Sequence, residues 1–322
     1  MQRPLSVVRT ALLLAAGLLI PGCFSMSGVA PPPGLPPYHF DGAPLAATFD
    51  PATPPEVESI WGASFVLVHP LVNGQDVGWF IFDTGASGWT ITRKAAERAG
   101  LVPFAWTNIQ GTTPSTVYAG ESVRLGPMTL HEPRLTGMNM SGSSLVFGRE
   151  ISGIVGKDVC QRAVIEIDAA GSRLALHDPG AFAEPRGATW HEVVTQKHLP
   201  HVRCRYANDG DGLFVLDSGC DGCVHFFGRA VEAHDLLAAG TTGRKTQITF
   251  GARQTIHTGT VERFAIGEQQ FGPVEATFAG EVDPASGTLP GTDGMIGMRF
   301  LKRFVVYLDL PRSRVAFMPG ER

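Results

Sequence analysis

Two aspartates follow apolar runs in the same way at two places in the chain. Asp83 ends the apolar run in GWFIFDTGAS, residues 78–87, and Asp217 holds the same place in DGLFVLDSGCD, residues 211–221. An ionised carboxylate loses its hydration when it is buried alone, so such an acid begins either an exposed turn or a site held for chemistry. Two carboxylates that share one proton can act together as general base and general acid, which is the chemistry that adds water to a carbonyl carbon.

A repeated pattern around the two aspartates favours the chemical interpretation. GIVGKDVCQRAVIEIDAAGSRLAL, residues 153–176, aligns without a gap on GMIGMRFLKRFVVYLDLPRSRVAF, residues 294–317. Between aspartate and repeat, each half carries a helix-like stretch followed by alternating strands. The helices are predicted at residues 93–100 and 228–240, and the strands within residues 115–130 and 253–271. The chain is therefore predicted to have two halves with the same order of elements, each supplying one aspartate.

At these residues the sequence resembles the aspartic proteases of the pepsin and retropepsin type. The motifs FDTGAS and LDSGCD, followed by the apolar-apolar-glycine turns GIVG and GMIG, carry the resemblance, which covers roughly residues 60–318. It implies an all-β, bilobal acid-protease fold with two pseudo-symmetric β-barrel lobes and a few short helices. The short lobes and their ends are similar to bacterial retropepsin-like proteins. Because both halves lie in one chain, a duplicated form that is complete as a monomer is expected.

The resemblance implies a role for each residue of the two motifs. Asp83 and Asp217 would form the catalytic dyad, which titrates as a pair and needs no metal or cofactor. The expected scaffold residues are Thr84, Gly85, Ser87, Ser218, Gly219 and Asp221. The Thr84 and Ser218 hydroxyls would hydrogen-bond across the pseudo-two-fold axis, and Ser87 would hydrogen-bond Asp83. The glycines let the backbone turn tightly beside the carboxylates.

Asp221 departs from the pepsin pattern and is similar to the second acid in the DTGAD motif of retroviral proteases, which binds substrate backbone. An extra carboxylate near Asp217 would disfavour ionisation of the dyad and raise its apparent pKa values. We therefore expect an activity optimum that is less acidic than that of stomach pepsin.

The family also closes hairpin flaps over its substrate. The two candidate corners are residues 109–118 and residues 250–255, and the possible flap residues are Gly111, Thr112, Tyr118, Gly251 and Arg253. Tyr118 fits either the flap tyrosine of pepsins or an ordinary tyrosine of a surface hairpin. Trp89 lies near the place of a pepsin tryptophan, with core packing as the competing interpretation.

The N-terminus has the layout of an exported protein. Basic Arg3 and Arg9 precede the apolar run ALLLAAGLLI, which is too short to span a bilayer comfortably. Residues 1–22 are therefore predicted to be a signal peptide, and the ending IPGC resembles a bacterial lipoprotein signal that leaves a diacylated Cys23. An ordinary signal peptide is the alternative. Residues 23–58, with the lipidated cysteine and a Pro-rich stretch, are predicted to be a tether, with a propeptide as the competing interpretation.

Composition excludes several other classes of protein. The net charge of −4 and the lack of basic runs argue against nucleic-acid binding. His191, His198 and His201 do not have the spacing of a metal site. Cys160, Cys204, Cys220 and Cys223 allow one or two disulfides. Cys220 and Cys223 form either a local bridge or two buried thiols, and Cys160 is expected in the core.

These observations predict an aspartic endopeptidase with an N-terminal lobe at residues 59–182 and a C-terminal lobe at residues 183–322. It would be lipid-anchored through Cys23 on the periplasmic face of a bacterial membrane, by resemblance the outer membrane. Its partners would be extended peptide or protein substrates, taken up in β conformation. A catalytically silent peptide-binding lipoprotein on the same fold is the main alternative, and a purely structural lipoprotein is a third.

Overall fold

The computed structural model describes residues 30–40, 43–62, 64–109, 113–207, 209–237, 241–249, 252–280 and 289–320. The predicted signal peptide and the candidate lipid site at Cys23 lie outside these residues. Strands account for 48% of the structure and helices for 12%, so the expected all-β class is confirmed. No helix in the described residues is both long and apolar enough to cross a membrane.

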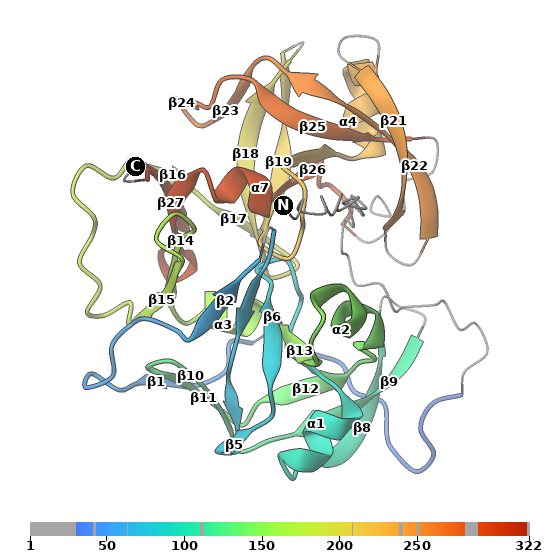
Figure 1. Ribbon diagram of the computed structural model, residues 1–322, viewed down its shortest axis with the longest axis vertical. Coiled ribbons are helices and arrows are strands. Elements are labelled where there is room, and N and C mark those ends of the chain that lie inside the picture. The colour runs from blue at the N-terminus through green and yellow to red at the C-terminus, as the bar shows by residue number, and fades with distance from the viewer. Residues whose placement is uncertain are drawn as a thin grey trace, which may run out of the picture.

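The N-terminal half forms the lower lobe in Figure 1. Its larger sheet has the order β2-β3-β6-β13-β7-β12-β9-β8, and a second sheet has the order β1-β11-β10-β4-β5. The strands of the larger sheet are β2 (Ser59–Trp61), β3 (Val66–Val68), β6 (Trp79–Phe82), β7 (Thr90–Ile91), β8 (Val102–Ile109), β9 (Thr113–Ala119), β12 (Arg134–Gly137) and β13 (Ile151–Val155). Those of the second are β1 (Ala47–Phe49), β4 (Leu71–Val72), β5 (Gln75–Asp76), β10 (Ser122–Leu125) and β11 (Met128–His131).

The C-terminal half forms the upper lobe in Figure 1 around one sheet of ten strands. Its order is β21-β22-β25-β20-β26-β19-β18-β23-β24, with β17 beside β18. The strands are β17 (Val194–Gln196), β18 (Leu199–Tyr206), β19 (Gly210–Asp217), β20 (Val224–Phe226), β21 (Thr241–Thr249), β22 (Ala252–Val261), β23 (Phe264–Ile266), β24 (Gln269–Gln270), β25 (Val274–Ala279) and β26 (Gly294–Gly297).

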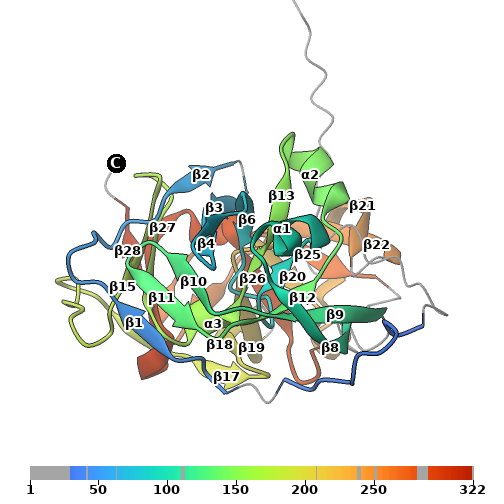
Figure 2. The ribbon, with the colours of Figure 1, turned by 90° about the horizontal axis from the view of Figure 1, so that it is seen from below.

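A third sheet joins the two halves, and Figure 2 shows it at one side of the molecule. Its order is β15-β14-β27-β28-β16, built from β14 (Val164–Asp168), β15 (Arg173–His177), β16 (Trp190–Glu192), β27 (Phe304–Asp309) and β28 (Arg314–Pro319). In the central antiparallel pair, Glu166 of β14 lies opposite Tyr307 of β27. These two residues are equivalent in the sequence alignment, so the sheet pairs the halves around a local two-fold axis.

The helices are short, and two of them lie in the helix-like stretches that the sequence predicts. They are α1 (Arg93–Arg98), α2 (Ser141–Phe147), α3 (Lys157–Cys160), α4 (Gly228–Ala233) and α7 (Met298–Leu301), with a 3₁₀ turn η1 (Leu310–Arg312). The Thr92 hydroxyl accepts a hydrogen bond from the Ala95 N–H at 3.3 Å and so caps α1. The helices predicted at residues 93–100 and 228–240 are α1 and α4, and each is shorter than expected.

Part of the segment predicted as a tether packs on the globular body. The Tyr38 N–H donates to the Trp106 carbonyl at 2.7 Å, and the Trp106 N–H donates to the Pro36 carbonyl at 2.9 Å, at the outer edge of β8. Further along, β1 pairs with β11, and the Val57 N–H donates to the Leu174 carbonyl at 2.8 Å. These hydrogen bonds satisfy backbone groups at exposed strand edges, which is why residues 36–38, 47–49 and 57 of the segment lie on the body.

The four cysteines of the described residues are free thiols rather than disulfides. Cys160, Cys204 and Cys220 are buried, and Cys223 is half-buried. Cys160 lies in the core, as its apolar place in the repeat predicts, and its counterpart Leu301 is in the same core. Of the two interpretations of Cys220 and Cys223, the structure therefore has unbridged thiols.

Candidate active site

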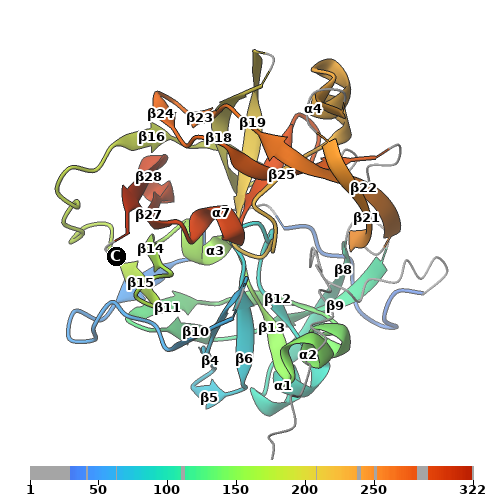
Figure 3. The ribbon, with the colours of Figure 1, turned by 45° about the horizontal axis from the view of Figure 1, so that its top comes forward.

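The two aspartates end the central strands of the two lobes. Asp83 follows β6, and Asp217 ends β19. In each lobe, the strand of the apolar-apolar-glycine motif runs parallel beside the aspartate strand: Phe82 lies opposite Val155, and Asp217 lies opposite Gly297. Figure 3 shows β6 with β13 and β19 with β26 meeting at the centre of the molecule. The matched strand pairs bring two residues that are far apart in the sequence to one point between the lobes.

The carboxyl groups of Asp83 and Asp217 interact directly with each other, and Asp217 is only 3% exposed while Asp83 is half-buried. The Gly85 N–H donates to Asp83 Oδ1, and the Gly219 N–H donates to Asp217 Oδ1, each at 2.8 Å. Burial raises the pKa of both carboxyls, and the nearby charge of Asp217 raises the pKa of Asp83 further. Two such groups do not ionise together, so the dyad holds one proton at a pH where an ordinary aspartate has lost it.

The predicted exchange of hydrogen bonds beneath the dyad is present. The Thr84 N–H donates to the Ser218 hydroxyl, and the Ser218 N–H donates to the Thr84 hydroxyl, both at 3.0 Å. The Thr84 hydroxyl donates to the Leu216 carbonyl at 2.8 Å, and the Ser218 hydroxyl donates to the Phe82 carbonyl at 2.9 Å. Thr84 and Ser218 are at most 1% exposed, so these bonds are shielded from water and tie the two aspartate loops together.

Both glycines of the motifs are required by close approach. A Cβ at Gly85 would lie 2.5 Å from the Asp217 Cγ, and a Cβ at Gly219 would lie 2.7 Å from the Asp83 Oδ1. Non-bonded heavy atoms overlap at these distances, so any side chain at Gly85 or Gly219 would displace the carboxyl of the opposite lobe. The backbone glycine of each loop therefore packs directly against the aspartate carboxyl of the other loop.

Ser87 and Asp221 have different surroundings from those expected. The described residues show no hydrogen bond between Ser87 and Asp83, whose Oδ1 is taken by the Gly85 N–H, and Ser87 lines the cavity beside the dyad. The Asp221 carboxylate pairs with Arg299, whose Nε lies 3.5 Å from Oδ1 and donates to the Asp221 carbonyl at 2.8 Å. Burial, rather than the Asp221 carboxylate, is the main cause of the raised pKa values of the two dyad carboxyls.

A cavity of about 430 Å³ opens beside the dyad and is lined by both lobes. We call it the dyad cavity. Its apolar walls include Ala86, Trp89, Ile154, Leu199, Val215 and Met295. Trp89 is 1% exposed and packs edge-to-face on Phe80, which agrees with the core interpretation while it also closes one side of the cavity. Phe40, from the segment predicted as a tether, lines the same cavity.

The two candidate flap corners are hairpins, β8–β9 and β21–β22, and whether they act as flaps stays a prediction. Gly111, Thr112 and Gly251 lie outside the described residues, as does the side chain of Arg253 in β22. Among the described residues of the first hairpin, Thr107, Asn108 and Ile109 of β8 line the dyad cavity. Ile109 begins the predicted corner, whereas Thr107 and Asn108 were not predicted from the sequence. Their position at the end of the strand before the predicted corner was the available signal.

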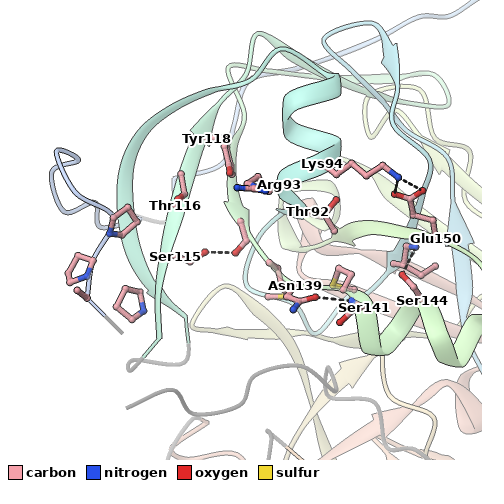
Figure 4. Close-up of a pocket in the computed structure, with 18 of the residues that line it drawn as sticks. Thr92, Arg93, Lys94, Ser115, Thr116, Tyr118, Asn139, Ser141, Ser144 and Glu150 are labelled. Carbon is pink, nitrogen blue, oxygen red and sulfur yellow. Dashed lines mark hydrogen bonds and ion pairs between the residues drawn. The ribbon is translucent and has the colours of Figure 1, made fainter. Parts of the chain in front are cut away.

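Tyr118 is not a residue of the dyad cavity but a wall of a separate groove. It lies in the body of β9, is 7% exposed, and pairs with Leu135 of β12. Figure 4 shows this second groove, of about 720 Å³, between β9, α1 and α2. The Lys94–Glu150 ion pair, at 2.9 Å, lies at one side of it. Tyr118 lines this second groove rather than the dyad cavity, so its surroundings fit the ordinary tyrosine of a hairpin, the second of the two interpretations, better than a flap tyrosine.

The histidines of the cluster noted in the sequence have separate surroundings. His191 donates to the Gln269 side chain at 2.8 Å, and His198 lies in the turn between β17 and β18. His201 is buried between Leu199 and Thr292, and burial lowers its pKa. Among the described residues, no group of three or more His, Cys, Asp or Glu is arranged to hold a metal ion.

Comparison with known proteins agrees with the geometry of the first lobe. Residues 68–159 match the family model described as aspartyl protease. The matched segment contains Asp83, the loop after it and the Gly153–Gly156 turn that supports the loop. No curated protein matches the chain. The match supports an aspartic protease family and a hydrolase that acts on peptide bonds.

Proposed function

We propose that this protein is an aspartic endopeptidase whose catalytic residues are Asp83 and Asp217. The observation that carries the proposal is the symmetric arrangement of the two carboxyls between the two loops. Each carboxyl is held by the glycine N–H of its own loop and lies against the glycine of the opposite loop. Placing two carboxyls in contact away from water costs free energy, and a purely structural role does not require it. Acids with raised pKa values beside a cavity are typical of catalytic sites.

The geometry supports water attack without a covalent intermediate. The ionised carboxyl takes a proton from water as the water oxygen bonds to the peptide carbonyl carbon, and the protonated carboxyl gives its proton to the carbonyl oxygen. The tetrahedral diol then collapses: its C–N bond breaks, the carboxyl that took the water proton gives it to the leaving nitrogen, and the other carboxyl takes a proton from a diol hydroxyl. The dyad therefore holds a single proton at every stage. The backbone N–H groups of Gly85 and Gly219 hold the carboxyls in place throughout.

We extend the proposal to the biological setting predicted from the N-terminal sequence. The chain would be a monomer with a duplicated architecture, exported by residues 1–22 and anchored through Cys23 at the periplasmic face of the outer membrane. The equivalent order of β13-α3-β14-β15 and β26-α7-β27-β28 supports the duplication. Anchoring limits the reach of the enzyme, which favours the processing of particular envelope proteins over bulk digestion.

The test is cleavage of a diverse peptide mixture by the full chain from pH 3 to pH 8, with products identified by mass spectrometry. The matched variants are Asp83→Asn and Asp217→Asn, and the control is Asp235→Asn at an exposed position of the C-terminal lobe. We expect cuts that vanish in both dyad variants and persist in the control. If the folded wild-type chain cuts nothing, the peptidase proposal is wrong and a silent peptide-binding protein takes its place. If the cuts survive in a dyad variant, cleavage does not depend on Asp83 and Asp217 and the proposed catalytic residues are wrong.

A further inference from the structure

The dyad cavity has one basic wall. Lys157, Lys197 and His198 line it, whereas the dyad supplies the only acidic side chains among the described residues that line the cavity. We call these three residues the basic wall. Of the three, Lys157 lies beside residues 85–88, directly after Asp83, because its N–H donates to the Ala86 carbonyl, and Lys197 and His198 line the same cavity from the other lobe. A cation in a cleft of low dielectric attracts anions far more strongly than the same cation on an open surface.

Lys157 is the buried member of the basic wall. It begins α3, its N–H donates to the Ala86 carbonyl at 2.9 Å, and its side chain is 6% exposed. Its ammonium donates to the Asp158 carboxylate at 3.2 Å, which uses one of the three donors of the group. The equivalent residue in the second lobe is Met298, which makes the same backbone bond to Cys220 at 2.8 Å. The turn therefore does not require an ammonium group, and its presence at this wall needs another reason.

Lys197 and His198 form the turn of the hairpin between β17 and β18. Gln196 pairs with Leu199, so these two residues make the whole loop, with φ angles of 48° and 66°. Such two-residue turns favour Asn and Gly, because other residues meet steric strain at positive φ. Non-glycine residues in strained turns concentrate at functional sites. This turn places two basic residues at the edge of the dyad cavity, next to Leu199 in its apolar wall.

We propose that the basic wall selects peptides that present a carboxylate to the side of the dyad formed by residues 85–88. The inference rests on the proposed peptidase function and names a substrate class for it. The carboxylate has two possible sources, an acidic side chain of the peptide or its C-terminus. In either case Lys157, whose charge is shared with Asp158, donates a hydrogen bond from one of its two remaining ammonium donors, and Lys197 adds attraction from the more exposed edge. The role is in binding and adds no chemical step.

The test compares matched peptide pools at constant pH and ionic strength. The pools have mixed sequence and differ only in Glu or Gln at fixed positions, each with a free or an amidated C-terminus. The proteins are the full wild-type chain, Lys157→Met, Lys197→Gln and the control Lys302→Gln. Lys302 is exposed, and its counterpart in the first lobe is Gln161, so the control makes the same change of charge at a compatible position.

We expect the wild-type chain to cut carboxylate-bearing pools with a KM about tenfold lower than that of their neutral partners, with similar kcat. A Glu-over-Gln preference assigns the effect to a side chain, and an acid-over-amide preference assigns it to the C-terminus. Lys157→Met should remove most of the preference, Lys197→Gln should reduce it, and Lys302→Gln should leave it unchanged. Because Lys157→Met leaves Asp158 without its partner, its thermal unfolding is measured alongside; Lys197→Gln lies in an exposed turn and provides the independent test.

A binding measurement separates this inference from the proposed function. The same pools, labelled with a fluorophore, are titrated with Asp83→Asn protein and followed by anisotropy. A carboxylate preference in binding without any cleavage by the wild-type chain would contradict the peptidase function and retain the basic wall. Equal affinities for charged and neutral pools, or a preference that survives both lysine substitutions, would overturn the inference even for an active peptidase.

Discussion

Thr84 and Ser218 hold each other through two reciprocal hydrogen bonds, each from a backbone N–H to the partner's hydroxyl at 3.0 Å. Each hydroxyl then donates to a carbonyl of the opposite lobe. Both residues are buried, so water cannot replace a lost bond. The position of the two aspartates relative to each other therefore depends on a pair of small hydroxyl side chains.

Loss of one hydroxyl should weaken both stability and catalysis. Thr84→Val removes an acceptor and a donor while keeping the shape of the side chain, which leaves the Ser218 N–H and the Leu216 carbonyl unpaired. We expect a loss of about 1–3 kcal/mol in the free energy of unfolding, measured with denaturant, and reduced kcat. Thr84→Ser keeps the hydroxyl and should stay close to wild type. In a double-mutant cycle with Ser218→Ala, additive effects would show that the two residues are not coupled.

The glycines of the two loops should not tolerate a methyl group. Gly85→Ala places a Cβ against the Asp217 carboxyl and is expected to lower kcat/KM by about a hundredfold or more, because a small displacement of a reacting group is costly. Gly62→Ala is the control, since its Cβ would lie at an ordinary 3.6 Å from the Phe65 carbonyl oxygen. Steady-state kinetics of both variants provide the measurement. Wild-type activity in Gly85→Ala would mean that the Asp217 carboxyl does not pack against Gly85 in the active enzyme.

The dyad should lower stability at neutral pH. The pKa of Asp83 is raised above the ordinary value of 3.8, chiefly by burial. The contribution of the protonated carboxyl to the free energy of unfolding is therefore fully present below pH 3.8 and is lost as pH rises through the raised pKa. Asp83→Asn removes this penalty and should increase Tm at pH 7 by about 2 °C or more, with a smaller effect at low pH. Differential scanning calorimetry tests this, with Asp235→Asn as an exposed control. A lower Tm for Asp83→Asn at pH 7 would contradict the prediction.

The same raised pKa values predict how activity depends on pH. Catalysis requires one proton on the dyad, so kcat/KM should remain high above pH 3.8 and fall only as the last proton leaves. We expect an optimum above about pH 4, less acidic than that of pepsin. Because Asp221 is paired with Arg299, Asp221→Asn should leave the falling limb of the profile almost unchanged. A shift of that limb to lower pH in Asp221→Asn would show that the charge of Asp221 raises the apparent pKa values of the dyad, as first expected from the sequence.

The sheet between the lobes should contribute a different pH dependence. Burial tends to raise the pKa of Glu166, but the hydrogen bond from His177 and the charge of Arg173 outweigh it and hold the pKa below 4.5. Its contribution to stability is therefore present above that pH and lost as pH falls through the lowered pKa. Glu166→Gln should lose about 1–2 kcal/mol at pH 7 and much less near pH 3, by chemical denaturation. Exposed Glu192→Gln should show no such difference, and an equal loss at both pH values in Glu166→Gln would rule out the ionic origin.

The sequence by itself determined the fold class and the two aspartates. Apolar strands ending in DTG and DSG, with a glycine turn downstream of each, are local patterns, and local patterns determine strands and turns. The resemblance of the two motifs to those of the aspartic proteases also implied the bonds between Thr84 and Ser218, which the structure contains.

The tertiary structure decided what surrounds those motifs. The pairing of Asp221 with Arg299, the burial of Tyr118 away from the dyad, and the packing of residues 36–38 on β8 all join segments that are distant in the sequence. The basic wall shows the same limit, since Lys157 and Lys197 belong to different lobes and come together at one cavity only when the lobes are assembled. Contacts of this kind depend on how two halves pack, and periodicity along one chain carries no record of that packing.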